Sequence, residues 1–158
     1  MRRKEREVMN MEEIRQILDG FKVCRLGLVD DGKPYIVPMN MAYDLDDGKL
    51  SIYFHCAKEG RKVDMIRKNP KVGFEMDQGI GLVEGNTPCQ YSYRYASVIG
   101  TGTVKIVEEE QEKVSALTKI MKHQTGKEFT EFAEDPKLLS AVCILRVDAE
   151  EYACKKNR

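Results

Sequence analysis

Two short turns that end in glycine constrain the fold of this 158-residue chain more than any other feature. Asp31-Gly32 follows the alternating run Val23–Asp30, and Asp46-Asp47-Gly48 follows the run Pro34–Tyr43. Asp-Gly supplies the positive-φ positions of a tight hairpin, so each turn joins two antiparallel strands. These segments therefore form three consecutive antiparallel strands rather than the βαβ units of a parallel sheet.

The third strand leads directly into a short helix. The stretch Leu50–Pro70 predicts a strand, a sharp turn at Ala57–Gly60 and a helix that Pro70 ends. Three cationic side chains lie at this turn, Lys58, Arg61 and Lys62. Because a helix start exposes unpaired N–H groups and the positive end of the helix dipole, the turn suits a phosphate. The alternative is a solvated basic helix face.

A helix precedes these strands, and a long strand follows them. Asn10 and Glu13 resemble a capping box and predict the start of a helix. Its buried apolar face is expected to be Met11, Ile14 and Leu18, and Gly20 ends it. After the second helix, Lys71–Asp77 alternates with Val72, Phe74 and Met76 facing inward. We expect residues 78–90 to form a glycine-rich loop.

The remaining segments complete a mainly β fold. Tyr91–Val107 predicts one long strand, in which Gly100 and Gly102 indicate a bend or a close approach by another backbone. Glu109–Gln124 predicts a helix whose apolar face is formed by Val114, Leu117 and Met121, with a solvated His123 near its end. A short helix is expected to begin at Asp135-Pro136. Two further strands are expected at Ala141–Asp148 and Glu151–Cys154. Six or seven strands with flanking short helices indicate a Greek-key or split β-barrel, and residues 1–158 are expected to form one domain.

Composition excludes several classes of function. Lys plus Arg and Asp plus Glu are both 26, whereas a nucleic-acid-binding protein usually has a basic excess. No apolar run approaches the roughly 20 residues that span a bilayer, and no hydrophobic segment follows the basic N-terminus. We therefore expect a cytoplasmic protein that binds neither nucleic acid nor membrane. Hydrolase and Walker motifs do not occur.

The cysteines do not form a recognisable metal or disulfide pattern. The five are irregularly spaced, without a C-x-x-C pair, so we expect no metal site. Cys24 and Cys143 lie in apolar strand patterns and are expected to be buried. Cys56 follows His55 beside the cationic turn, where a thiol pKa could be lowered, and a catalytic thiol there is a minor alternative.

Proline interrupts the second strand. Pro38 cannot donate a ladder hydrogen bond, which marks an edge or a bulge at that position. The backbone around Val37–Asn40 is then free to bond a ligand. A simple edge strand without a ligand is the alternative.

Several blocks in succession resemble one family. They are Pro34–Asn40, Tyr53–Lys62, Asn69–Val72, Phe74–Asp77 and Arg94–Gly102, and Met1-Arg2-Arg3-Lys4 fits the usual start. These blocks cover nearly the whole chain in the right order. The chain resembles the pyridoxamine-phosphate-oxidase-like flavoproteins, in particular the branch related to nitroimidazole-resistance reductases.

The resemblance implies a split barrel that binds FMN at a homodimer interface. It places the FMN phosphate at the cationic turn, the isoalloxazine ring along the 37–40 backbone, and Ser97 and Val98 along the flavin. His55 matches a frequent active-site histidine and is the expected catalytic residue; Tyr53 is a weaker candidate. The family often has a T-G-K segment near its last strand, where this chain has Ala153-Cys154-Lys155. The expected cofactor contacts are Val37, Pro38, Met39, Asn40, His55, Cys56, Lys58, Gly60, Arg61, Lys62, Ser97 and Val98.

The function that the resemblance implies is an FMN-dependent oxidoreductase. It would reduce a small organic substrate with electrons from NAD(P)H, while the protein orients the cofactor and excludes solvent. A protein that binds flavin, a related cofactor or haem without turnover is the competing interpretation, because no dedicated nicotinamide motif occurs. A regulatory or interaction domain without a small ligand is a third.

Overall fold

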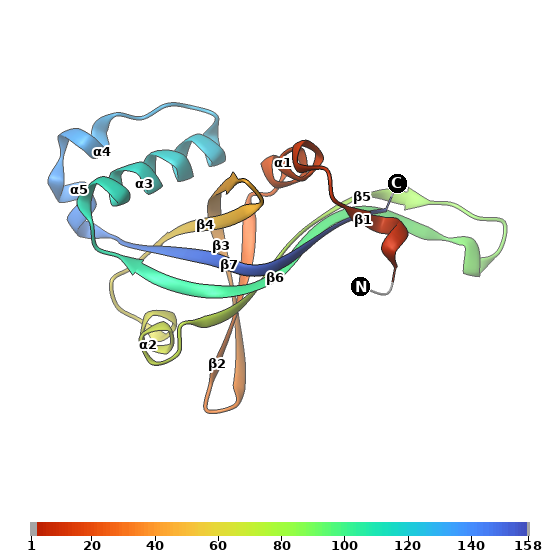
Figure 1. Ribbon diagram of the computed structural model, residues 1–158, viewed down its shortest axis with the longest axis horizontal. Helices are drawn as coiled ribbons and strands as arrows, with labels where there is room; N and C mark the ends of the chain where they lie inside the picture. Colours follow the sequence, from red (N-terminus) through yellow and green to blue (C-terminus); the bar gives the residue numbers. More distant parts are fainter. Residues whose placement is uncertain (1–2, 158) are drawn as a thin grey trace.

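The computed structural model describes residues 3–157, apart from the side chains at 134 and 136, as a β-barrel with helices around it (Figure 1). Met1 and Arg2, which belong to the family-like start, lie outside the described residues. The strands are β1 (Glu7–Val8), β2 (Val23–Asp30), β3 (Lys33–Asp46), β4 (Lys49–Cys56), β5 (Lys71–Val83), β6 (Ser92–Val107) and β7 (Cys143–Asn157). The helices are α1 (Met11–Gly20), α2 (Arg61–Lys68), α3 (Glu110–Thr125), α4 (Glu131–Glu134) and α5 (Pro136–Ala141), with single turns η1 (Lys4–Arg6) and η2 (Pro88–Gln90).

The described strands form one antiparallel sheet that closes on itself. Its order is β1-β7-β4-β3-β2-β5-β6, and β6 also pairs with β7. Six strands therefore form a ring, and β1 is added where Val8 pairs with Cys154. The predicted split barrel is confirmed.

Both predicted hairpin turns are present. Asp31 and Gly32 have φ values of 50° and 75°, and Asp47 and Gly48 have values of 45° and 76°. Two successive left-handed residues form the turn that matches the twist of paired strands. These turns fix the register of β3 against both of its neighbours.

Alternating apolar residues fill the barrel, as the sequence predicts. Cys24, Leu26 and Leu28 of β2 are buried, and so are the three predicted inward residues of β5 and Cys143 of β7. Asn10 accepts a hydrogen bond from the Glu13 amide and so begins α1.

Two glycines allow β6 to bend against its neighbours. A Cβ at Gly100 would lie 2.4 Å from Cζ of Phe74 and 2.5 Å from the Glu151 carbonyl oxygen. At Gly102 it would lie 2.4 Å from the Asp148 carbonyl oxygen. The β6–β7 register shifts between Thr101 and Gly102. The predicted close approach is thus confirmed, and it lies at a bulge where the barrel closes.

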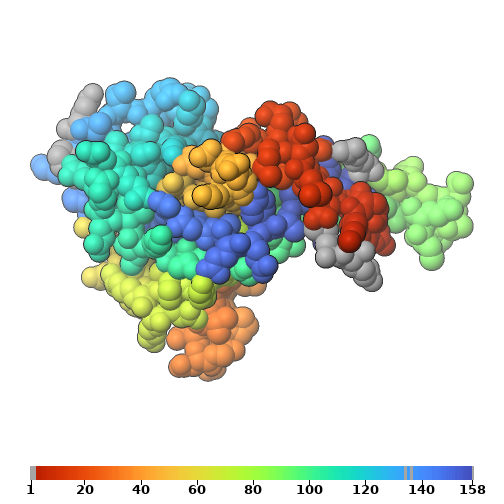
Figure 2. Space-filling model, in the orientation of Figure 1, coloured from red at the N-terminus to blue at the C-terminus, as the bar shows by residue number. Residues whose placement is uncertain are grey.

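Some predicted boundaries are wrong. Residues 78–83 continue β5 instead of forming a loop, and they pair with β6 through a register shift between Gly79 and Gly81. The resulting hairpin projects from the barrel (Figure 2). The predicted strands 141–148 and 151–154 are one strand, β7, because pairing with β6 continues across the bulge. This strand begins at Cys143, since Ala141 is the last residue of α5. Each error follows from partners that lie far away in the sequence.

The buried faces of helices α1 and α3 also differ from the predicted ones. In α1, Met11 is 44% exposed at the β3–β4 turn, and Ile17 is buried with Ile14 and Leu18. In α3 the buried residues are Ala116, Leu117 and Ile120. They pack over the outer face of β3, β4 and β7 against Ala42, Tyr53 and Ile144. No helix within residues 3–157 is long and apolar enough to cross a membrane.

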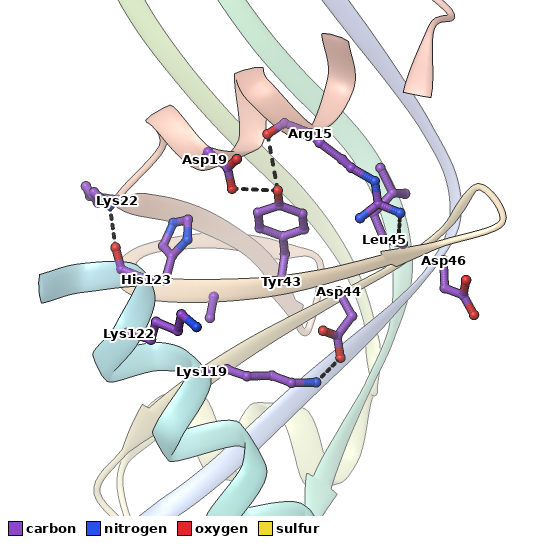
Figure 3. A pocket seen from close by; sticks show the side chains of 11 residues that line it. Arg15, Asp19, Lys22, Tyr43, Asp44, Leu45, Asp46, Lys119, Lys122 and His123 are labelled. Carbon is purple, nitrogen blue, oxygen red and sulfur yellow. Dashed lines mark hydrogen bonds and ion pairs between the residues drawn. The ribbon is translucent and has the colours of Figure 1, made fainter. Parts of the chain in front are cut away.

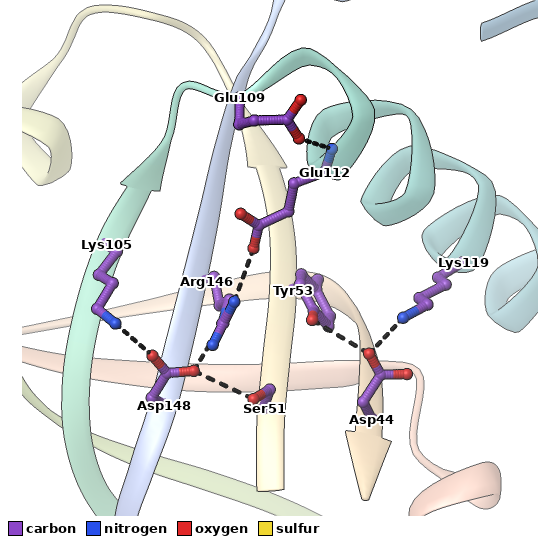
Figure 4. A network of polar contacts seen from close by, with 9 residues as sticks. All are labelled: Asp44, Ser51, Tyr53, Lys105, Glu109, Glu112, Lys119, Arg146 and Asp148. Carbon is purple, nitrogen blue, oxygen red and sulfur yellow. Dashed lines mark hydrogen bonds and ion pairs between the residues drawn. The ribbon is translucent and has the colours of Figure 1, made fainter. Parts of the chain in front are cut away.

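A polar network ties α3 to the sheet (Figure 4). The Nη1 atom of Arg146 lies 2.8 Å from Oε1 of Glu112, and its Nε lies 2.6 Å from Oδ1 of Asp148. Asp148 also accepts hydrogen bonds from Ser51 (3.1 Å) and Lys105 (2.9 Å). Burial favours protonation of Asp148, but these hydrogen bonds outweigh it and lower the pKa of the carboxyl.

Candidate functional site

A split between β3 and β4 creates the candidate site. β3 pairs with β4 only from Met41 to Asp46, while residues 33–40 pair with β2. His55 and Cys56 of β4 pair instead with β7. The two strands therefore diverge, and each presents a backbone edge to the gap between them.

A cavity of about 470 Å³ lies in this gap, within the range of roughly 300–1,000 Å³ of small-molecule sites. Strands β3 and β4 each form one side of this cavity, and Lys62 of α2 lies on a third side. Six of the predicted cofactor contacts line it together with Ala57 and Val142: Pro38, Met39, Asn40, His55, Cys56 and Lys62.

Pro38 lies at a sheet edge, as predicted, and the register through it is unbroken, so it is not a bulge. It pairs with Arg25 on one side only, because β4 pairing begins at Met41. In the described part of the chain, no strand pairs with the other side of residues 37–40. This edge is where the backbone can bond a ligand.

The N-terminus of α2 is next to the cavity. Gly60 begins the helix with φ 130° and ψ 165°, a conformation available essentially to glycine alone. Its carbonyl accepts from the amides of Val63 (2.9 Å) and Asp64 (3.1 Å). Among residues 3–157 no side chain caps the helix, so its first amides remain available to an anion.

The cations at this turn have no acidic partners within the described residues. Arg61 and Lys58 are exposed, and half-buried Lys62 reaches the cavity wall. The Arg61 guanidinium carbon lies 4.4 Å from the centroid of the Tyr35 ring, which holds the side chain by a cation–π contact. At the other end of α2, by contrast, Arg67 and Lys68 are paired with acidic residues.

The other predicted contacts lie outside this cavity. Lys58 and Gly60 belong to the turn, and Arg61 is the first residue of α2, next in sequence to Lys62 of the cavity wall. Val37 packs against the barrel core. Ser97 and Val98 of β6 lie three strands away, because the register runs from β3 through β2 and β5 to β6. At about 4.8 Å per strand, the path along the curved sheet is about 14 Å. Val98 is fully buried, so its side chain does not reach the surface.

Two minor alternatives from the sequence, a low-pKa thiol at Cys56 and a site role for Tyr53, do not fit the structure. Burial, and then the neighbouring Cys143 thiol, raise the pKa of Cys56 to about 11, although Lys62 acts in the opposite direction. Cys56 is therefore not a low-pKa thiol. Tyr53 is buried beneath α3, where its hydroxyl donates to Asp44 (3.1 Å), and it does not line the cavity.

A larger cavity of about 720 Å³ lies between α1, β3 and α3 (Figure 3). Its polar groups already bond one another: the Tyr43 hydroxyl donates to Asp19 (2.7 Å), and Lys119 pairs with Asp44. His123 is not solvated as predicted; its Nε2 lies 2.6 Å from the Phe21 carbonyl oxygen. Burial lowers the pKa of His123. The polar side chains of this region bond one another and hold α1, β3 and α3 together, so we do not take it as the ligand site.

Four residues of the site were missed: Ala57, which directly follows Cys56, and three that come from other segments. Tyr35, Val142 and Cys143 enter it through contacts between distant segments. Tyr35 lies within a family-like block, which is the one signal that could have indicated it. Nothing in the local sequence places Cys143 opposite Cys56.

Comparison with known proteins decides the family. The sequence model of the pyridoxamine 5'-phosphate oxidase family matches residues 10–156. The chain belongs to this family. No curated protein is similar enough in sequence to be counted as a relative.

Solved structures of other proteins share the fold of this pyridoxamine 5'-phosphate oxidase family member. A candidate 5-nitroimidazole antibiotic resistance protein from Bacteroides thetaiotaomicron is 28% identical, with a TM-score of 0.78 over 95% of this chain and 86% of the other. An FAD and haem binding protein from Mycobacterium smegmatis is 16% identical (TM-score 0.76, 97% and 74% covered). An FAD-binding protein from Mesorhizobium loti is 22% identical (TM-score 0.65, 95% and 96% covered).

Proposed function

We propose that this chain binds FMN and is an FMN-dependent oxidoreductase of the cytoplasm. The observation that carries the proposal is the uncapped, cationic N-terminus of α2 beside a cavity with an unpaired strand edge. The turn fits a phosphate, and the adjacent edge fits the hydrogen-bonding rim of a flavin ring. Flavin-binding proteins among the similar structures support this choice of cofactor.

Each part of the site has its own role in the proposal. Lys58, Arg61 and Lys62 neutralise the phosphate, and the conformation of Gly60 aims the first helix amides at it. The 37–40 edge orients the ring, while Met39 and Val142 exclude water from it. FMN, when bound, supplies the redox chemistry. His55 is exposed at the cavity wall, where it can hold a substrate or donate a proton to it.

We propose further that two copies form the site together. The outer face of β3, β2, β5 and β6 carries Ile36 of β3 and Ile99 of β6, which are 67% and 52% exposed, around a shallow depression at Gly27 and Gly73. The same face carries Arg25, which pairs with Glu75 and Asp77. Exposed apolar side chains beside charged ones are typical of an interface. Ser97 lies on the same face as Ile99 but is only 8% exposed, so in this proposal a second copy bound there brings the β6 backbone at Ser97, rather than its side chain, toward the flavin.

Reduction of the bound flavin tests the enzymatic part of the proposal. Under anaerobic stopped-flow conditions, NADH or NADPH should bleach the flavin absorbance, and a nitroaromatic compound should restore it. We choose a nitroaromatic acceptor because of the similar candidate resistance protein. FAD in place of FMN measures cofactor preference, and weaker binding of FAD is expected.

A binding protein without turnover is the second candidate function, favoured by the similarity to an FAD and haem binding protein. The stopped-flow experiment with NADH or NADPH distinguishes this candidate from an oxidoreductase. Flavin that binds but is not reduced at a useful rate by either nucleotide would support it and exclude the NAD(P)H-dependent oxidoreductase.

A further inference from the structure

Two cysteines from distant parts of the chain face each other at the cavity. Cys56 ends β4 and Cys143 begins β7, and the antiparallel register places them directly opposite. Both lie on the inner face of the barrel, beyond the buried pair Phe54 and Leu145. The two thiol groups are close enough that Cys143 raises the pKa of Cys56. Directly opposed residues have Cβ atoms about 4.5–5.5 Å apart, close to the separation of roughly 3.5–4.5 Å in a disulfide.

The two thiols differ in access to solvent. Cys56 is half-buried and lines the cavity, whereas Cys143 is 7% exposed behind it. Lys62, on the same wall, favours the Cys56 thiolate. The pair thus has an outer thiol that a small molecule can reach and an inner thiol that can resolve the product. Cys89 is exposed in another part of the fold, the β5–β6 hairpin.

We propose that Cys56 and Cys143 form a reversible disulfide in the wall of the cavity, with a small-molecule disulfide as the oxidant. The Cys56 thiolate attacks one sulfur of the oxidant, and the other leaves as a thiol after it takes up a proton. Cys143 then attacks Sγ of Cys56 and releases the second small thiol. Two protein thiols are oxidised to one disulfide, and one small disulfide is reduced to two thiols.

The cross-link changes the part of the structure that holds the cavity. It joins the end of β4 to the start of β7, immediately before the turn that leads to α2. Because it closes a long loop, it also restricts the unfolded chain, so the oxidised protein should melt at a higher temperature. In a reducing compartment such a bond is transient, as expected of a redox-sensing pair.

Mass spectrometry of the purified full chain tests the proposal without added flavin. The protein is reduced, freed of reductant, incubated with glutathione disulfide, alkylated and digested. We expect a peptide that links Cys56 to Cys143 and that disappears after treatment with dithiothreitol. Because only the thiolate reacts and the pKa of Cys56 is about 11, the rate should rise about tenfold per pH unit near neutrality.

Variants separate the two steps. Cys143→Ser should stop at a glutathione adduct on Cys56, Cys56→Ser should give no linked peptide, and Cys89→Ser should behave as the wild type. A wild-type protein that stops at the adduct, or in which both thiols stay alkylatable after prolonged oxidation, would overturn the proposal. Flavin binding plays no part in this readout, so the failure of either proposal leaves the other standing.

Discussion

At the scale of single residues, the two cations at the start of α2 have different surroundings. Arg61 is exposed and held over Tyr35, whereas Lys62 is half-buried in the cavity wall. A charge-assisted hydrogen bond is stronger where water is partly excluded. Lys62 should therefore contribute more to phosphate binding than Arg61, although both face the same helix terminus.

Substitution of these cations should weaken FMN binding. We expect Arg61→Ala to raise the dissociation constant about tenfold and Lys62→Ala to raise it up to about a hundredfold. Fluorescence titration with FMN measures both. Arg67→Ala is the matched control, because Arg67 is on the same helix but pairs with Asp64 at its far end. Unchanged affinity in both site variants would place the phosphate elsewhere.

His123 should make stability depend on pH. Burial lowers its pKa in the folded state, so below about pH 6.5 the unfolded chain binds more protons than the folded one. Its stabilising effect is complete above that pH and is lost as the pH falls toward the folded pKa. Urea unfolding at about pH 7.5 and about pH 5 should show a smaller difference for His123→Gln than for the wild type. An equal difference would mean that His123 is not the group responsible.

At the scale of elements, local pattern predicted more of the strands than of the site. Three features follow from local signals. Alternation of apolar residues gives the bounds of β2, the Asp-Gly pairs give the two hairpin turns, and Pro70 marks the end of α2. The extension of β5 and the continuity of β7 depend on pairing with β6, which local sequence does not encode. The cavity follows from the divergence of β3 and β4, and Pro38 alone indicated that edge.

The close contact at Gly100 gives a test of the barrel corner. Gly100→Ala would force a methyl group within 2.5 Å of Phe74 and the Glu151 carbonyl, so we expect a loss of about 1–3 kcal/mol or more in unfolding free energy. Chemical denaturation measures this loss. Gly81→Ala, whose Cβ would meet nothing within 4 Å, should be near neutral. Equal effects of the two substitutions would contradict the close approach.

At the scale of the whole molecule, a closed barrel leaves few places for a large ligand. The described strands complete a ring, and α3 covers one part of its outside. The cavity at the split and the apolar face around Ile36 remain exposed. The proposed dimer would cover this face and complete the wall of the flavin site.

The dimer can be tested by a charge at this face. The wild type with FMN should have the mass of two chains by light scattering, and Ile36→Asp should shift it toward one. Leu138→Asp, on the exposed side of α5, is the control and should leave the mass unchanged. A wild-type protein with the mass of one chain would contradict the proposal.

The most direct test of the account compares FMN with riboflavin, which has the same ring but no phosphate. Titration of the flavin-free protein should show FMN bound at one molecule per chain and at least about tenfold more tightly than riboflavin. In Lys62→Ala this preference should largely disappear, because the lost contact is made to the phosphate. A protein that binds neither flavin, or binds both equally, would contradict the central claim that the α2 turn holds the phosphate of FMN.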